Sequence, residues 1–169
     1  GALEAVTAAR QAADATGGGE VHALVAGAPG IETVAEALGR HGADLVVGVA
    51  HEGLGRYHPE ALAATVAARI SAGGYRAAFF AGSAEGRDLA PRVAGTLGVA
   101  MAADLTGFEI GADRVTVRHP VYTGKVIATL ELTGAPAVLS LRPGAVTAAE
   151  TPRTPKVEAM APVGDPAAS

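Results

Sequence analysis

The sequence predicts an α/β fold, a three-layer α/β/α arrangement around a mainly parallel sheet, with an antiparallel β-meander in the second half. Short apolar strands alternate with helical stretches as far as about residue 97. The hydrophobic residues, 49% of the chain, are mostly Ala and Val, and aromatic residues make up 4%, as in closely packed layered folds. After Gly98 the alternation ends, and short strand-like runs follow one another across Gly-containing turns.

Expected helices and strands alternate along the first half of the chain. The helix that opens the chain has Leu3 and Val6 at helical spacing and ends at a run of three glycines. Pro91 lacks an N–H and fixes φ, so it is expected in a first turn, which places the last helix start near Asp88, a capping residue type. The expected helices are 2–15, 31–41, 59–72 and 88–97, and the expected strands are 20–26, 43–50 and 77–81.

The second half is read as a meander and a tail. Its expected strands are 103–110, 114–122, 125–132 and 137–141, with a tight turn at Thr123-Gly124. Five of the ten prolines lie in residues 143–169, among small polar residues. We therefore divide the chain into an α/β domain, residues 1–143, and a Pro-rich linker, residues 144–169, that is loosely held apart from one short strand at 157–160.

Composition excludes several classes of protein. A net charge of −4, with no basic run interleaved with aromatic residues, argues against nucleic-acid binding. No stretch of about 18 apolar residues occurs, so membrane insertion is not expected. The absence of cysteine removes disulfides and thiol catalysis, and it fits a reducing cytosol. We expect a cytoplasmic bacterial protein of one domain plus a tail.

A glycine-containing loop after the strand at 77–81 is the candidate binding site. Such a loop places backbone N–H groups at the carboxyl edge of a sheet, where open α/β folds bind nucleotides. The same residues also suit a tight strand–helix connection, and Glu85 adds negative charge where a phosphate would lie. Both interpretations stay open. The residues proposed for a nucleotide of the AMP type are Gly82, Ser83, Gly86, Arg87 and Asp88.

No catalytic constellation stands out in the sequence. Ser83 lies between a strand and a helix, but the GxSxG pattern of a nucleophile elbow is absent. The five histidines lack HxH or HxxxH spacing, so no metal site is expected. We predict a chain without catalytic residues of its own.

Several stretches resemble the alpha subunit of electron-transfer flavoprotein. The longest, residues 82–105, reads GSAEGRDLAPRVAGTLGVAMAADL. Others in the same order are EVHALVAG at 20–27, GADLVVGVAHEGLGRYHPEALAATV at 42–66, RHPVYTGKVIATLEL at 118–132 and SLRP at 140–143. Together they extend over most of residues 1–145.

The resemblance implies a subunit of an electron carrier. Its fold would be the adenine-nucleotide-hydrolase-like first domain of the alpha subunit. In this family the alpha subunit pairs with a beta subunit, and the heterodimer carries one FAD. It takes electrons from dehydrogenases, such as the acyl-CoA dehydrogenases of fatty acid beta-oxidation, and passes them to a quinone reductase.

The resemblance also implies where the nucleotides bind. The beta subunit holds an AMP at the position equivalent to the Gly82–Asp88 loop. FAD is held mainly by a second alpha domain, which would follow this chain, so this segment alone is expected to bind no cofactor. The family also has a strand before the first helix, with no counterpart here, that lies between the strands at 20–26 and 77–81. We therefore expect those two strands not to pair with each other.

Overall fold

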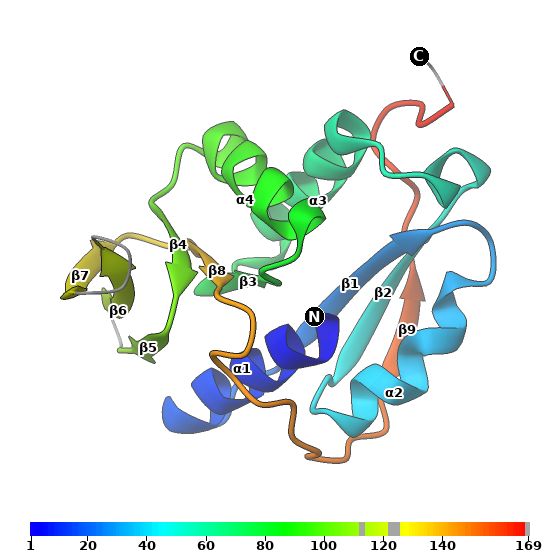
Figure 1. Ribbon diagram of the computed structural model, residues 1–169. Coiled ribbons are helices and arrows are strands. Elements are labelled where there is room, and N and C mark those ends of the chain that lie inside the picture. Colours follow the sequence, from blue (N-terminus) through cyan, green and yellow to red (C-terminus); the bar gives the residue numbers. More distant parts are fainter. Residues whose placement is uncertain (112–113, 122–125, 168–169) are drawn as a thin grey trace.

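The computed structural model describes residues 1–111, 114–121 and 126–167 (Figure 1). The α-helices are α1 (Ala2–Ala15), α2 (Ala35–Arg40), α3 (Pro59–Gly73) and α4 (Ala84–Leu97), and two short 3₁₀ helices are η1 (Ile31–Val34) and η2 (Glu52–Gly55). The strands are β1 (His22–Gly27), β2 (Leu45–Ala50), β3 (Ala77–Phe80), β4 (Met101–Leu105), β5 (Gly107–Ile110), β6 (Arg114–Val121), β7 (Val126–Thr133), β8 (Ala137–Leu141) and β9 (Lys156–Ala159). The predicted turn at Thr123-Gly124 lies outside the described residues.

Two parallel sheets form the middle layer. One has the strand order β1-β2-β9 and the other β3-β8-β4, with parallel pairing throughout. β2 and β8 are apolar runs at the centre of their sheets, and both are almost fully buried, as expected of strands covered on both faces.

Helices cover both faces of this layer (Figure 1). On one face α1 and α2 pack on β1 and β2 through an apolar cluster that includes Val6, Leu38 and Val46. On the other face α3 and α4 pack together over β3, with Val66 and Val93 in their shared cluster. The three-layer α/β fold predicted from the sequence is confirmed.

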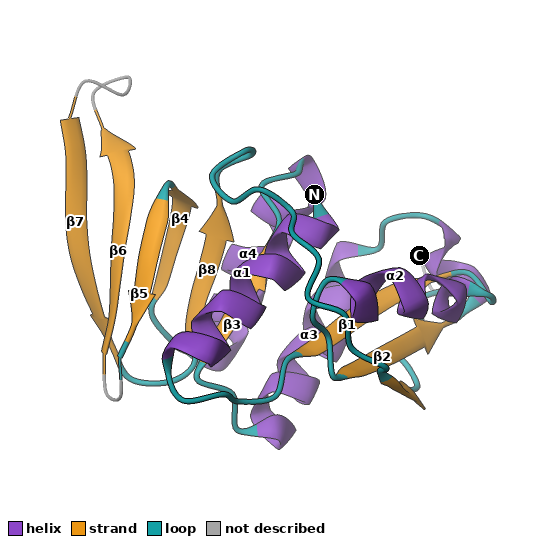
Figure 2. Cartoon of the chain, turned by 90° about the horizontal axis from the view of Figure 1, so that it is seen from below, coloured by secondary structure: helices purple, strands orange, loops and turns teal. Residues whose placement is uncertain are grey.

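The antiparallel part is a three-stranded sheet with the order β5-β6-β7 (Figure 2). The prediction of four meander strands is wrong in two respects. The run 103–110 is divided at Thr106 between β4 and β5, and 137–141 (β8) inserts in parallel between β3 and β4. The apolar sequence of β8 explains its place, because burial on both faces is available only at the centre of a sheet.

The start of α4 also differs from the prediction. The helix begins at Ala84, with Ser83 as N-cap, and Pro91 lies inside it rather than in the first turn. Asp88, expected to be the cap, is in the second turn. The hydroxyl of Ser83 accepts a hydrogen bond from the Gly86 N–H at 3.2 Å, so the capping requirement is already met by a residue eight positions before Pro91.

The tail is held more closely than its composition suggests. β9 pairs in parallel with β2 and forms the edge of the first sheet. The N–H of Arg153 donates to the Gly39 carbonyl at 2.8 Å, and that of Val163 donates to the Thr65 hydroxyl at 2.9 Å. The expectation of a loosely held tail is therefore corrected for these residues. Backbone hydrogen bonds hold them against the domain, although their side chains bury little surface.

β1 and β3 face each other without pairing. Within the described part of the chain β1 pairs only with β2, and β3 pairs only with β8, so the two parallel sheets stay separate. This agrees with the expectation that the strands at 20–26 and 77–81 do not form a ladder.

Candidate functional site

The predicted binding loop lies at the carboxyl end of β3, where the chain enters α4. Ser83 accepts hydrogen bonds from two N–H groups of the first turn. Its hydroxyl accepts from the Gly86 N–H, and its carbonyl accepts from the Arg87 N–H at 2.9 Å. Ser83, Glu85 and Arg87 are exposed. The structure thus brings the five predicted residues together, but part of the donor set that would hold a phosphate is engaged within the loop.

The two glycines of the loop are required by close packing. A Cβ at Gly86 would collide with the Ala81 carbonyl, and a Cβ at Gly82 would collide with the carbonyl of Leu141 at the end of β8. Neither glycine has a positive φ. Their role in this structure is to let the turn approach its neighbours, which is the structural interpretation of the motif.

Asp88 joins the loop to the connection after β2. Its carboxylate accepts hydrogen bonds from the Tyr57 hydroxyl at 2.8 Å and from the Arg92 Nε at 3.1 Å. The bond from Tyr57, followed by that from Arg92, lowers the pKa of Asp88. Burial first, and then the bond to Asp88, raises the pKa of Tyr57 to about 12. At neutral pH the pair is a phenol donating to a carboxylate, which keeps negative charge beside the first turn of α4.

The loop borders a large apolar cleft between β1 and β3. Its volume is about 760 Å³. Aliphatic and aromatic side chains from both strands line it, together with residues of α1 and α3, and Tyr57, Ser83 and Glu85 lie among its lining residues. The cleft separates the two strands that the resemblance predicted would not pair.

A polar network occupies the opposite end of the same gap. The Tyr75 hydroxyl lies 2.7 Å from His22 Nδ1 and accepts from Arg69 Nε at 3.1 Å. Arg69 also pairs with Glu158 of β9 at 3.1 Å. The bond to Tyr75 is the main cause that raises the pKa of Arg69. These contacts link β1, α3 and β9.

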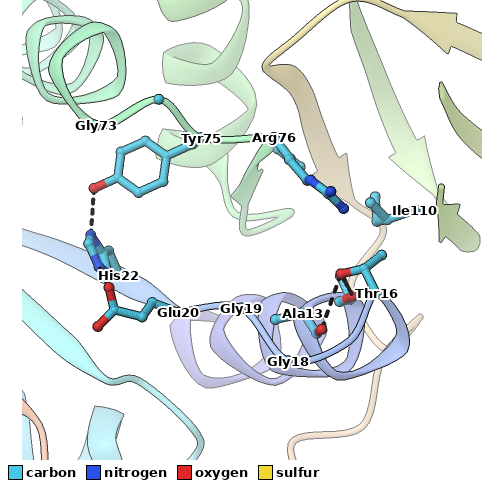
Figure 3. Close-up of a pocket in the computed structure, with 13 residues that line it drawn as sticks. Ala13, Thr16, Gly18, Gly19, Glu20, His22, Gly73, Tyr75, Arg76 and Ile110 are labelled. Carbon is cyan, nitrogen blue, oxygen red and sulfur yellow. Dashed lines mark hydrogen bonds and ion pairs between the residues drawn. The ribbon is translucent and has the colours of Figure 1, made fainter. Parts of the chain in front are cut away.

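A second cavity, of about 400 Å³, opens beside this network (Figure 3). Figure 3 shows Tyr75 pointing toward His22 across the gap, with Gly18, Gly19 and Gly73 on the rim. The C-terminal ends of α1 and α3 reach this cavity, and helix C-termini carry partial negative charge. Arg76 also lines this cavity, so groups of both signs of charge surround it.

The sequence analysis also missed a buried ion pair at the base of α1. The Arg10 side chain is 4% exposed and pairs with Asp14 and Asp44, each at 2.8 Å. It donates as well to the carbonyls of Gly19 and Gly42. In the sequence, the only indication of this cluster was one Arg in a helix rich in alanine. Its partner Asp44 lies 34 residues further along the chain, so no local pattern joins the two.

Two properties of the described residues concern metal binding and membrane insertion. Three His, Cys, Asp or Glu side chains placed to hold a metal ion do not occur together in this part of the chain. In the same residues every helix is too short or too polar to cross a bilayer.

Comparison with known proteins adds the family context. The model of the electron transfer flavoprotein domain matches residues 1–163. The chain is 34% identical over 127 residues to the electron transfer flavoprotein subunit alpha of Syntrophomonas wolfei subsp. wolfei (strain DSM 2245B / Goettingen), covering 75% of this chain and 40% of that protein. It is 26% identical over 160 residues to the subunit of the same name from Bacillus subtilis (strain 168), covering 94% and 48%. The chain thus spans less than half the length of these relatives.

Proposed function

Because this chain belongs to the electron transfer flavoprotein family, we propose that it is the alpha-subunit domain on which a beta subunit docks, in an electron carrier rather than an enzyme. In this proposal the heterodimer carries FAD between dehydrogenases and a quinone reductase. The domain itself is a scaffold without chemistry of its own. It keeps the cytoplasmic bacterial location expected from the sequence.

The support for docking is an exposed apolar face on the β6–β7 hairpin. Val126 and Leu130 of β7 are 49% and 44% exposed, although both lie opposite apolar residues of β6, Val121 and Val117. Val117 is fully buried, so the apolar face of the hairpin continues past the edge of the core. Within the described residues β7 pairs only with β6, which leaves its outer edge open. Extended apolar surface of this kind marks protein interfaces.

The loop that enters α4 is a poor match for the pyrophosphate of a flavin dinucleotide. The loop that enters α4 places Gly86 against the Ala81 carbonyl and uses two first-turn N–H groups within the turn. It also presents the carboxylates of Glu85 and Asp88, which would repel a pyrophosphate. We therefore place FAD on other parts of the heterodimer and assign it no contact here.

Docking is tested with the variant Leu130→Glu. A buried charge in the interface should weaken the affinity for the purified beta subunit by at least about tenfold, as measured by surface plasmon resonance. Val157→Glu is the matched control, because Val157 is an aliphatic residue on the edge strand β9 and is 55% exposed, somewhat more than Leu130. Wild-type affinity of Leu130→Glu, or an equal loss in Val157→Glu, would reject this docking surface.

The alternative function is an adenine-nucleotide site at Gly82, Ser83, Gly86, Arg87 and Asp88. Its support is the position of the loop at the edge of the large cleft, beside Tyr57. The carboxylates in the loop weigh against it. Calorimetric titration with AMP distinguishes the two functions, since the docking proposal expects no heat of binding in the absence of the beta subunit.

A further inference from the structure

The connection between β2 and α3 is held at both ends by histidine side chains that accept hydrogen bonds. This connection, the 51–58 segment, contains η2. His51 is the N-cap of η2, and its Nδ1 accepts from the Gly53 N–H at 2.9 Å. His58 is the N-cap of α3, and its Nδ1 accepts from the Ala61 N–H at 3.3 Å. Both ends of the segment therefore depend on an imidazole nitrogen that carries no proton.

Only a neutral imidazole can make these two contacts. A neutral imidazole has one donor nitrogen and one acceptor nitrogen, whereas an imidazolium ion has two donors and no acceptor. Protonation would therefore leave the Gly53 and Ala61 N–H groups without their capping partners. At His58 it would also place a positive charge at the N-terminal end of a 15-residue helix, where the partial charge of the helix is already positive.

His41 shows the opposite arrangement at the other end of a helix. It follows the last residue of α2, and its Nδ1 lies 2.9 Å from the carbonyl oxygen of Ala37. Because a carbonyl oxygen can only accept, Nδ1 of His41 carries the proton of this bond, and an imidazolium would keep the bond intact. Acid is therefore expected to act selectively on the two caps of the 51–58 segment.

The 51–58 segment also contacts α4 and the tail. The Tyr57 hydroxyl donates to Asp88 of α4 at 2.8 Å. A Cβ at Gly53 would lie 2.7 Å from the carbonyl carbon of Pro166, so the tail packs directly on η2 (Figure 1). Opening of the segment would loosen both contacts.

Charged side chains surround the segment without titrating in the same interval as a histidine. Carboxyl groups in general titrate at lower pH than imidazole, and guanidinium groups at higher pH. Within the described residues, the charged groups on the segment and on the elements that contact it are Glu52, Arg56 and Glu60, Glu32 of η1, Glu85, Asp88 and Arg92 of α4, and Asp165 of the tail.

We propose that His51 and His58 form a pH-sensitive latch on the 51–58 segment. Above about pH 7 both imidazoles are neutral, the caps are made and the segment is closed. Below about pH 6 both are protonated, the caps are lost and the segment opens, which frees Tyr57 from Asp88 and the tail from η2. Because the closed form binds fewer protons than the open form, its stability decreases as the pH falls. The latch does not depend on the docking of a beta subunit.

Amide hydrogen exchange of the 169-residue chain, followed by NMR at about pH 7.5 and about pH 5.5, tests the latch. After correction for intrinsic exchange rates, the protection of the Gly53 and Ala61 amides should fall at least about fivefold at the lower pH, as expected for the loss of one cap. The amide of Val47, in the central strand β2, is the internal control and should keep its protection. The imidazole nitrogen shifts at about pH 7.5 should place the proton of both rings on Nε2.

Asparagine separates the cap from the titration, because its side-chain oxygen accepts hydrogen bonds at every pH. In the double variant His51→Asn/His58→Asn, the protection of the two amides at about pH 5.5 should remain within about twofold of that at about pH 7.5. His41→Asn is the matched control and should keep the pH response of the wild type.

Three results would overturn the proposal. The first is equal protection of the Gly53 and Ala61 amides at both pH values. The second is a proton on Nδ1 of either ring at about pH 7.5, where the latch requires an acceptor. The third is an equal loss of protection in the double variant, which would assign the response to the surrounding carboxyl groups. The first two are measured on the wild-type chain, so they decide the question even if the double variant does not fold.

Discussion

Arg10 is the residue whose removal is expected to destabilise the fold most. Its guanidinium is buried among two carboxylates and two backbone carbonyls, and Asp44 also accepts from the Val21 N–H at 2.9 Å. Arg10→Ala leaves Asp44, whose side chain is 21% exposed, without its main partner. We expect a loss of about 3–5 kcal/mol in the free energy of unfolding, measured by urea denaturation.

A matched surface pair provides the control for Arg10. Arg40 pairs with Glu36 at 3.3 Å, but the two side chains are 48% and 87% exposed. Arg40→Ala should therefore change the free energy of unfolding by less than about 1 kcal/mol. Similar losses in the two variants would mean that the buried cluster adds little to stability.

The Tyr57–Asp88 pair makes stability depend on pH at both extremes. Folding raises the pKa of Tyr57 from 10.0 to about 12. The contribution of Tyr57 to the free energy of unfolding is therefore complete below pH 10 and is lost as the pH rises from 10 to about 12. Folding lowers the pKa of Asp88, so its contribution is present above the unfolded pKa and is lost as pH falls through the folded one.

Replacing Asp88 tests the causes of the Tyr57 shift. In Asp88→Ala the pKa of Tyr57 should fall toward 10 without reaching it, because burial is the larger cause and remains. The tyrosinate signal in an alkaline titration, followed by NMR, reports this directly. Glu85→Ala, which removes the weakest of the contributing charges, is the control and should change the pKa less. A Tyr57 pKa insensitive to Asp88 would contradict the hydrogen bond.

At the scale of elements, the docking of β9 depends on Gly39. A Cβ at this position would lie 2.8 Å from the Arg153 carbonyl oxygen and still closer to the ring of Pro155. Gly39→Val should therefore push the tail away from α2 and weaken the pairing of β9 with β2. Trypsin should then cut at Arg153 and Lys156 faster than in the wild type, as followed by mass spectrometry.

Gly95 is the matched control for that experiment. It lies in α4, and a Cβ there meets no atom within 4 Å. Gly95→Ala should leave the cleavage of the tail unchanged and raise the free energy of unfolding by about 0.5–1 kcal/mol through helix propensity. Unchanged cleavage in Gly39→Val would show that the close approach of the tail is not what holds it.

At the scale of the whole molecule, the chain purified by itself should not retain FAD. The basis is that the loop entering α4 uses two of its first-turn N–H groups within the turn and carries the carboxylates of Glu85 and Asp88, which would repel a pyrophosphate. We expect no flavin absorbance after desalting. Stoichiometric flavin that survives desalting would contradict both this expectation and the placing of FAD elsewhere in the heterodimer.

The sequence by itself determined the elements whose signals are local. The helix expected at 2–15 is present at Ala2–Ala15, and the apolar run at 43–50 contains β2, because periodicity and apolar content are properties of neighbouring residues. The candidate loop was predicted as one unit for the same reason, since its five residues are nearly contiguous. The family resemblance was likewise carried by contiguous stretches.

Only the tertiary structure decided what depends on distant partners. β8 inserts between β3 and β4, Arg10 is buried against Asp44, and Tyr57 reaches Asp88 across 31 positions in the chain. The family resemblance already predicted that β1 and β3 do not pair, but the lining of the cleft between them is decided by the tertiary structure. Strand order and burial depend on which distant segments pair with one another when the chain folds. A pattern among neighbouring residues therefore cannot predict them.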